Sequence, residues 1–296
     1  LNSMDIESKK FLGQPKNFVS IFNALLFDGQ PVLKPEYLKD ENSELVMNVS
    51  SKHVDIIKRY EDGTYLDLFV IESQSYVDQC MVARVMEYEC VARMRYIRQN
   101  FKKHVPMHTR LPMILTVVLY VGESKWNAAK RLSELEIIHP GFEDMFNEFK
   151  LNLIELNTNH KYNTGEKATQ DFFDLLRMIY RKQILKEDLD REFNRDALYF
   201  AYVVTKNKEL LNIYQESEKG DVKVCRALDE MFEESTNKGI QMGIKQGIEQ
   251  GVERGVKNTQ IKIAIKMLVR NNQTLEEISE IVGLDLDALR ELKKSI

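Results

Sequence analysis

The sequence predicts an α/β or α+β core, in which strands are mixed with helices, followed by a helical C-terminal extension. Apolar runs of strand length stand at residues 65–74, 111–122 and 151–157, and a segment with helical periodicity separates the first two. From residue 169 to about residue 235 the patterns are helical. The chain has 296 residues and 43% hydrophobic content, which is enough for one large or two modest domains.

Charge and cysteine content narrow the classes of protein to consider. The formal net charge is −4, so any contact with nucleic acid needs a local basic patch. The sequence lacks an apolar run of about 18 residues, so we expect no membrane span. Its start lacks the regions of a signal peptide, and Leu1–Ser3 read as a remnant before a native start at Met4. A cytoplasmic location is predicted by three cysteines without metal-ligand spacing, Cys80, Cys90 and Cys225.

Composition and motifs divide the chain into five segments. These are an N-terminal tail at 1–12, the mixed domain at 13–190, a helical extension at 191–235, a Gly-repeat helix or linker at 236–258, and a small helical tail at 259–296. In the mixed domain a helix is expected at 16–27. Asp62-Gly63 between two apolar runs predicts a two-residue hairpin loop. Asp78 is placed to cap the next helix.

The segment 236–258 repeats Gly-(Ile/Val)-x-x, with glycine at every fourth position. Each glycine costs an isolated helix about 1 kcal/mol relative to alanine, so a helix here needs a partner. Glycines at this spacing leave a groove in which two backbones approach closely, beside a stripe of Ile and Val. The repeat therefore predicts a homo-oligomer through paired helices, and a flexible linker is the alternative.

Residues 259–296 have the length and the turn of a helix-turn-helix. Thr274 and Glu277 have the spacing of a capping box, Gly283 ends that helix, and Asp285 can cap the next one. The last helix is acidic at its start, where it would meet DNA. A small helical cap without a role in DNA binding is therefore the alternative.

Two polar residues, Glu72 and Gln74, follow an apolar run where a buried strand would stay apolar. A two-residue loop at 62–63 places Asp55 opposite Val70 on the facing strand. Because side chains alternate along a strand, Asp55, Glu72 and Gln74 then share one face of the sheet. The two acidic residues become diagonal neighbours, about 7–8 Å apart at the backbone.

Two converging carboxylates repel each other unless a positive charge lies between them. A hard divalent cation with oxygen ligands is the natural occupant. Mg²⁺ held by Asp55 and Glu72 can bind a phosphate oxygen and activate a water for in-line attack, and Gln74 would orient that water or the phosphate. The alternative is an exposed polar strand end with solvated carboxylates.

The sequence resembles the recombination-promoting nuclease family of transposase-like proteins, a branch of the PD-(D/E)XK nuclease superfamily. The resemblance covers most of the chain, through "FNALLFDGQPVLKPEYL", "VDIIKRY", "IESQSYVDQCMVARVMEYE", "LPMILTVVLYVGESKW" and "KLNLIEL" to the Gly-repeat tail. It implies a restriction-endonuclease-like α/β fold, a mixed sheet flanked by helices, which makes residues 13–190 a nuclease domain. It also implies cleavage of DNA with Mg²⁺, for which Mn²⁺ can substitute.

The resemblance assigns roles to residues of the "IESQ" strand and its neighbour. Asp55 matches the acid of the motif and Glu72 its second metal ligand. The backbone carbonyl of Ser73 would face the metal. Gln74 stands where the wider superfamily has Lys, a replacement that this branch often shows.

Two further helices match the family pattern. On the helix after the strand, Arg84 would contact a phosphate, and Tyr88 would hydrogen-bond near the site or belong to the core. In the first helix the family often has Asp where this chain has Ser20, while Asn23 remains. Serine supplies no negative charge to a metal or its water, so this departure favours weak, one-metal or absent catalysis.

A basic run suits the phosphates of DNA. No acid lies between Cys90 and Arg110, and the interval contains Arg93, Arg95, Arg98, Lys102 and Lys103. The alternative is a solvated helix face paired with acids elsewhere.

The sequence therefore predicts a Mg²⁺-dependent DNA endonuclease that is oligomeric through its tail. The competing hypothesis is a catalytically weak or inactive DNA-binding or assembly protein on the same fold. The two differ in whether bound DNA is cleaved.

Overall fold

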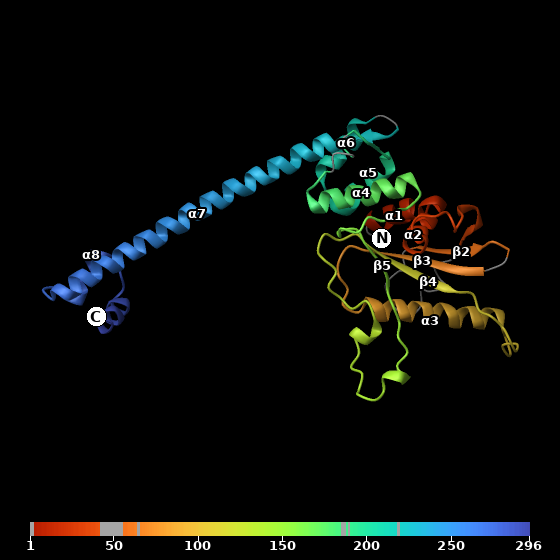
Figure 1. Cartoon of the computed structure of the whole chain (residues 1–296), viewed down its shortest axis with the longest axis horizontal. Coiled ribbons are helices and arrows are strands. Elements are labelled where there is room, and N and C mark those ends of the chain that lie inside the picture. Colours follow the sequence, from red (N-terminus) through yellow and green to blue (C-terminus); the bar gives the residue numbers. More distant parts are fainter. Residues whose placement is uncertain (1–2, 42–55, 64–65, 185–187, 189, 218–219) are drawn as a thin grey trace. The chain divides into compact units, whose positions relative to one another are not determined.

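The computed structural model describes residues 3–41, 56–63, 66–184, 188, 190–217 and 220–296 (Figure 1). They form two compact units, Leu1–Asp229 and Glu230–Ile296. The first unit contains a mixed sheet flanked by helices, and the restriction-endonuclease-like α/β fold class is confirmed. Its α-helices before α7 are α1 (Ser3–Leu12), α2 (Pro15–Phe27), α3 (Met81–Asn100), α4 (Lys167–Arg181), α5 (Arg195–Thr205) and α6 (Lys208–Glu216), and the 3-10 helix η1 (Pro35–Tyr37) precedes the first strand.

The sheet runs in chain order, β1-β2-β3-β4-β5. The pairs β1–β2 and β2–β3 are antiparallel, whereas the pairs β3–β4 and β4–β5 are parallel. The strands expected at 111–122 and 151–157 are β4 and β5. β3 is paired on both sides, and α3 provides the crossover to β4 that a parallel pair requires. The strand bounds are β1 (Leu38–Asp40), β2 (Ile56–Glu61), β3 (Leu66–Gln74), β4 (Ile114–Tyr120) and β5 (Asn152–Glu155).

The register of the β2–β3 hairpin differs from the prediction by two residues. Glu61 pairs with Leu66, and Val70 pairs with Ile57 rather than with Asp55. A slip of two residues leaves every side chain on the same face, so the apolar pattern fits both registers and the length of the connection decides between them. Asp55 itself lies outside the described residues.

Helices cover both faces of the sheet (Figure 1). On one face is α2, where the rings of Phe22 and Phe69 are 4.8 Å apart. On the other face is α3, whose Tyr88 lies in one buried cluster with Leu68 and Val70. Because side chains alternate along β3, its even-numbered residues, including Glu72, face α3.

The segment expected as an N-terminal tail forms helix α1 from residue 3 onwards. The ring of Phe11 stacks on Phe200 of α5 at 4.9 Å, which ties the start of the chain to the helical extension. Between α4 and α7 lies a two-stranded ribbon, β6 (Glu192–Phe193) and β7 (Val222–Lys223), which the helical pattern does not predict. The first unit consequently extends past the predicted boundary at residue 190.

The second unit consists of most of α7 (Cys225–Arg270) with α8 (Leu275–Val282) and α9 (Leu286–Lys294). The Gly repeat lies inside α7 as continuous helix, so the helix and not the linker is observed. Thr274 and Glu277 form both halves of the predicted capping box, and Gly283 ends α8 at φ 72°. A buried cluster joins the three helices through Ala264, Leu268, Ile278, Val282 and Leu289.

Within the part of the chain that the structure describes, no helix combines the length and apolar character that crossing a membrane requires.

Candidate active site at the end of strand β3

Glu72 and Gln74 lie at the carboxyl end of β3, on the face covered by α3. Both side chains are buried, with 2% and 5% of their surface exposed. The Gln74 Nε2 donates a hydrogen bond to Glu72 Oε1 at 2.8 Å. For Glu72 the alternative of a solvated carboxylate at an exposed strand end is therefore wrong, because the carboxylate is enclosed here beside its amide neighbour.

Arg84 places a positive charge against this carboxylate. Its Nη2 donates to Glu72 Oε1 at 3.2 Å and to the Tyr88 hydroxyl at 2.8 Å. Its Nε donates to the same hydroxyl at 3.1 Å, and its Nη1 donates to Asp78 Oδ2. Burial alone would lower the pKa of the Arg84 guanidinium, but its bonds to Asp78 and Tyr88 and the charge of Glu72 raise that pKa above its ordinary value.

These contacts bear on the phosphate contact expected for Arg84. A guanidinium has five N–H groups, and all three of its nitrogens donate to protein atoms here. The side chain is also only 17% exposed. In this conformation Arg84 orients Glu72, and its contact with a phosphate stays a prediction.

Asp78 is a site residue that the sequence reasoning assigned only to capping. Its Oδ1 accepts from the Cys80 backbone N–H at 2.9 Å, just before α3 begins, while its Oδ2 accepts from Arg84. Helical spacing rules do not apply to this pair, because Asp78 precedes the helix. Only the fold of the β3–α3 connection brings the two side chains together.

Tyr88 satisfies both of the roles considered for it. Its hydroxyl accepts two hydrogen bonds from Arg84. Its ring is 5% exposed and belongs to the buried cluster between α3 and the sheet. It therefore supports Arg84 from the core.

The oxygen donors of this site fit a hard divalent cation. The Gln74 Oε1 is buried and accepts no hydrogen bond from the described residues, and it lies on the side chain that contacts Glu72. Mg²⁺ is commonly held by one or two carboxylates with several waters, so a large protein cage is not required. Within the described ranges, no group of three or more His, Cys, Asp or Glu side chains is arranged to hold a metal. The metal ligand expected at Asp55 lies outside those ranges, and the carbonyl role of Ser73 stays a prediction.

The structure does not bring Ser20 and Asn23 to this carboxylate. Both lie on α2, which covers the opposite face of the sheet. The Ser20 Oγ donates to Thr169 Oγ1 on α4 at 2.8 Å. The Asn23 amide makes two 2.9 Å bonds with the backbone of Leu33. Their supporting roles at the site have no geometric basis in this conformation.

The basic run follows α3 away from Glu72. Arg98 comes 14 positions after Arg84, which is about 21 Å along a helix axis. Arg98, Lys102 and Lys103 are exposed and Arg95 is half-buried. Arg93 instead donates to the buried Glu89 at 2.8 Å, a partner that precedes the acid-free interval by one residue.

A comparison with known families matches this chain to one of them. A family model described as "Putative transposase, YhgA-like" matches residues 36–210, which is more than half of the chain and includes β3 and α3. The match confirms the resemblance that the sequence motifs indicate. No curated protein and no solved structure matched the chain.

Proposed function

Because the chain belongs to the YhgA-like transposase family, which is part of the PD-(D/E)XK nuclease-like group, we propose that it is a Mg²⁺-dependent DNA endonuclease. The observation that carries this proposal is the enclosed pair at the end of β3. There the buried Glu72 carboxylate contacts Gln74, whose own carbonyl oxygen accepts no bond from described residues. Buried oxygens at the end of a parallel strand are a suitable start for a magnesium site.

The residues that would hold the ion are Glu72, the Gln74 amide oxygen, the Ser73 carbonyl and Asp55. Bound Mg²⁺, or Mn²⁺ in its place, polarises a phosphodiester oxygen and lowers the pKa of a water. The second N–H of the Gln74 amide would orient the attacking water without adding charge. Arg84 holds the Glu72 carboxylate in one orientation, and Asp78 and Tyr88 hold Arg84.

DNA would lie along α3 and the loop that follows it. The exposed Arg98, Lys102 and Lys103 are the cations available to phosphates. Contacts of this kind position the duplex without reading its sequence. About 21 Å of helix between Arg84 and Arg98 matches roughly six base pairs at about 3.4 Å each.

The Gly repeat of α7 supports a homo-oligomer. A Cβ at Gly243, Gly247 or Gly251 would meet nothing within 4 Å, so this helix face is open in the single chain. The adjacent apolar stripe is 52–61% exposed at Ile240, Ile244, Ile248, Val252 and Val256. A second copy of α7 would cover the stripe and offset the cost of the glycines.

A DNA-binding protein without cleavage is the second candidate, and two observations favour it. Arg84 already supplies a cation to Glu72. Ser20, in the place of the family acid, bonds to α4 on the far side of the sheet. In that case Glu72 belongs to an active site that has lost its activity, and its ion pair with Arg84 only stabilises the fold.

Cleavage of a supercoiled plasmid separates the two functions. We expect wild-type protein to nick or linearise it with Mg²⁺ or Mn²⁺ and to leave it intact with EDTA. Glu72→Gln should lower the rate by at least about 100-fold, as loss of a group acting in the transition state does. Asp55→Asn should have the same effect.

The matched control is Glu89→Gln. Glu89 is also a buried glutamate on the α3 face, 5% exposed and paired with an arginine, but it contacts Arg93 and the Thr116 backbone N–H instead. This variant should cleave at the wild-type rate. Intact plasmid with wild-type protein under every condition, together with salt-dependent binding of the duplex, would establish the DNA-binding function instead.

A further inference from the structure

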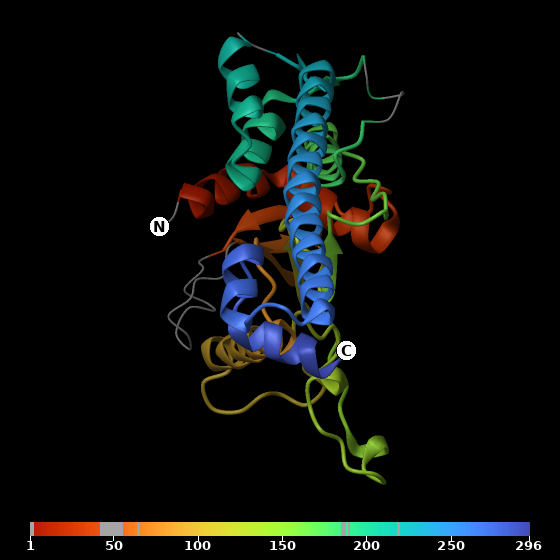
Figure 2. The same cartoon turned by 90° about the vertical axis from the view of Figure 1, so that its left-hand side faces the viewer.

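Between β4 and β5 the chain leaves the sheet and forms a projecting arm, residues 132–149, which we call the acidic arm (Figures 1 and 2). It contains two short 3-10 helices, η3 (Leu132–Glu134) and η4 (Glu143–Met145). A β-bridge between Arg131 and Lys150 closes its base, and the Leu132 N–H donates to the Phe149 carbonyl at 3.0 Å. The arm therefore has a defined root in the first unit.

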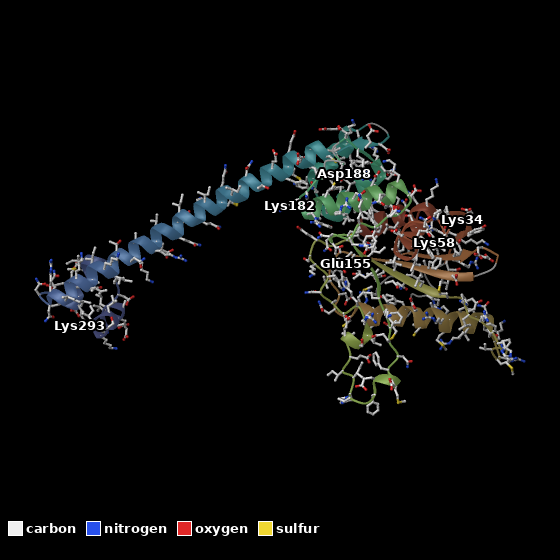
Figure 3. All side chains as sticks on the ribbon, viewed as in Figure 1. Lys34, Lys58, Glu155, Lys182, Asp188 and Lys293 are labelled. Carbon is white, nitrogen blue, oxygen red and sulfur yellow. The ribbon has the colours of Figure 1, made fainter. Side chains whose placement is uncertain are left out.

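The tip of the acidic arm exposes large apolar side chains. Ile137, Phe142 and Met145 are 91%, 61% and 77% exposed. The tip nonetheless has its own hydrogen bonds, from Met145 N–H to the Phe142 carbonyl at 3.0 Å and from Gly141 N–H to Glu143 Oε2 at 2.8 Å. Figure 3 shows side chains standing outward along the arm. Exposed apolar groups clustered on an ordered projection indicate an interaction site.

The charge of the arm limits its partners. Residues 132–149 contain no Lys or Arg and five acids, Glu134, Glu136, Glu143, Asp144 and Glu148. This charge repels DNA phosphates and anionic lipid headgroups, and it disfavours the pairing of two arms. The partner that fits is a surface both basic and apolar.

The same chain carries such a surface in residues 101–113, which we call the basic loop. It contains no acid, and its Lys102, Lys103 and Arg110 are exposed. Met107 is 85% exposed at the tip of a turn in which the Thr109 N–H donates to the Pro106 carbonyl at 3.2 Å. Further apolar side chains are exposed beside it at Val105, Leu111 and Met113. The basic loop therefore matches the acidic arm in both charge and apolar character.

The acidic arm and the basic loop lie at opposite ends of α3 (Figure 1). The strand end beside the arm, at Leu151, belongs to a buried cluster with Met81 and Val82 in the first turn of α3. The basic loop begins after Asn100 at the last turn. A 20-residue helix spans about 30 Å, so the two surfaces of one copy are well separated.

We propose that the acidic arm of one copy docks on the basic loop of a second copy. The contact is head-to-tail, because the acidic arm of each copy binds the basic loop of the next copy. It joins copies through the first unit, independently of the Gly repeat, and a copy docked in this way would compete with DNA for Lys102 and Lys103. The apolar tips Ile137 and Met145 meet Met107, and the acids of the arm meet Lys102 and Lys103.

Charge reversal in the full-length chain tests this contact by sedimentation at low salt without nucleic acid. The arm variant Glu136→Lys with Asp144→Lys changes two exposed acids and leaves the hydrogen bond of Glu143 at the tip in place. The loop variant is Lys102→Glu with Lys103→Glu. Each variant alone should weaken self-association by at least about tenfold, because like charges then face each other.

Two combinations of these substitutions test whether the two surfaces contact each other. An equimolar mixture of the arm variant and the loop variant should associate again, and so should the fourfold variant, since opposite charges face each other in both. The control Lys16→Glu with Lys125→Glu makes the same change of net charge as the loop variant, at other exposed sites, and should associate as wild type does. The tail is unchanged throughout. The proposal would be overturned if both charge-reversed variants associate as wild type does, or if neither the mixture nor the fourfold variant restores the lost association.

Discussion

At the scale of single residues, the candidate site depends on how the charge of Glu72 is balanced. The carboxylate accepts hydrogen bonds from Gln74 and Arg84, and Asp78 and Tyr88 fix the guanidinium. Breaking a buried ion pair by removing one partner is strongly destabilising, because the remaining charge lacks a counterion. A metal ion at the same carboxylate would supply a second source of positive charge.

Arg84→Gln tests how far the stability of the fold depends on a cation beside Glu72. Without Mg²⁺ we expect the variant to lose about 3 kcal/mol of unfolding free energy, since Glu72 then lies buried without a cation. Mg²⁺ should restore part of that loss, because a ligand that binds only the folded state stabilises it. Thermal unfolding with and without Mg²⁺ measures both effects.

Arg93→Gln is the matched control for that variant. It removes the cation from the buried Glu89, for which no metal role is proposed. The control should also be destabilised, though less, because Arg93 is 37% exposed against 17% for Arg84. Mg²⁺ should stabilise Arg84→Gln more than Arg93→Gln, and equal stabilisation of the two variants would show that the ion does not replace the lost charge of Arg84 at Glu72.

The sequence pattern predicts part of this site and misses the rest. Glu72 and Gln74 are recognisable because polar residues interrupt an apolar strand, and both are buried as a site requires. The pairing of Asp78 with Arg84 depends on a connection before the helix, where spacing has no fixed geometry. The place of Ser20 depends on which face of the sheet α2 covers, and the pattern of a single helix does not contain that information.

At the scale of elements, periodicity predicts the helices and strands better than their register. The helix at 16–27 and the strands at 111–122 and 151–157 are present with small differences in bounds. The hairpin slips by two residues because both registers bury the same apolar face. The ribbon of β6 and β7 has only two residues in each strand, which is too short for a pattern to appear.

α7 provides the prediction at this scale. Replacing Gly243, Gly247 and Gly251 with Leu should stabilise the isolated helix, because each glycine costs about 1 kcal/mol relative to alanine and leucine is nearly as favourable. The same change should lower the oligomer mass in light scattering, since the side chains fill the groove between helices. Alanine at the three positions is the control with the smallest added volume. An unchanged oligomer mass in the leucine variant would show that α7 does not pair through its glycine face.

At the scale of the whole molecule, the charge distribution matters more than its sum. The net charge is −4, yet the basic loop and the end of α3 form an acid-free interval, while the acidic arm contains no Lys or Arg. The chain therefore has two oppositely charged surfaces, and each attracts a different kind of partner. Phosphates would select the basic interval, and the acidic arm would exclude them.

The salt dependence of DNA binding tests this distribution. Lys102→Ala with Lys103→Ala should reduce the slope of log affinity against log salt by about 1.8, or about 0.9 for each lost phosphate contact. The effect should be the same for duplexes of different sequence, because such contacts do not read bases. Lys16→Ala with Lys125→Ala is the control on exposed lysines elsewhere. An unchanged slope in the variant with Lys102→Ala and Lys103→Ala would place the DNA on another surface.

If the buried Glu72 carboxylate holds a divalent ion, a titration with Mn²⁺ will detect the site. We expect wild type and Glu89→Gln to bind Mn²⁺ with equal affinity at this site, and Glu72→Gln to bind it at least about tenfold more weakly, because glutamine lacks the charge of the carboxylate ligand. Equal Mn²⁺ affinity in wild type and Glu72→Gln would show that Glu72 is not a ligand of the ion. The Glu72–Arg84 pair would then be a structural ion pair rather than part of a metal site.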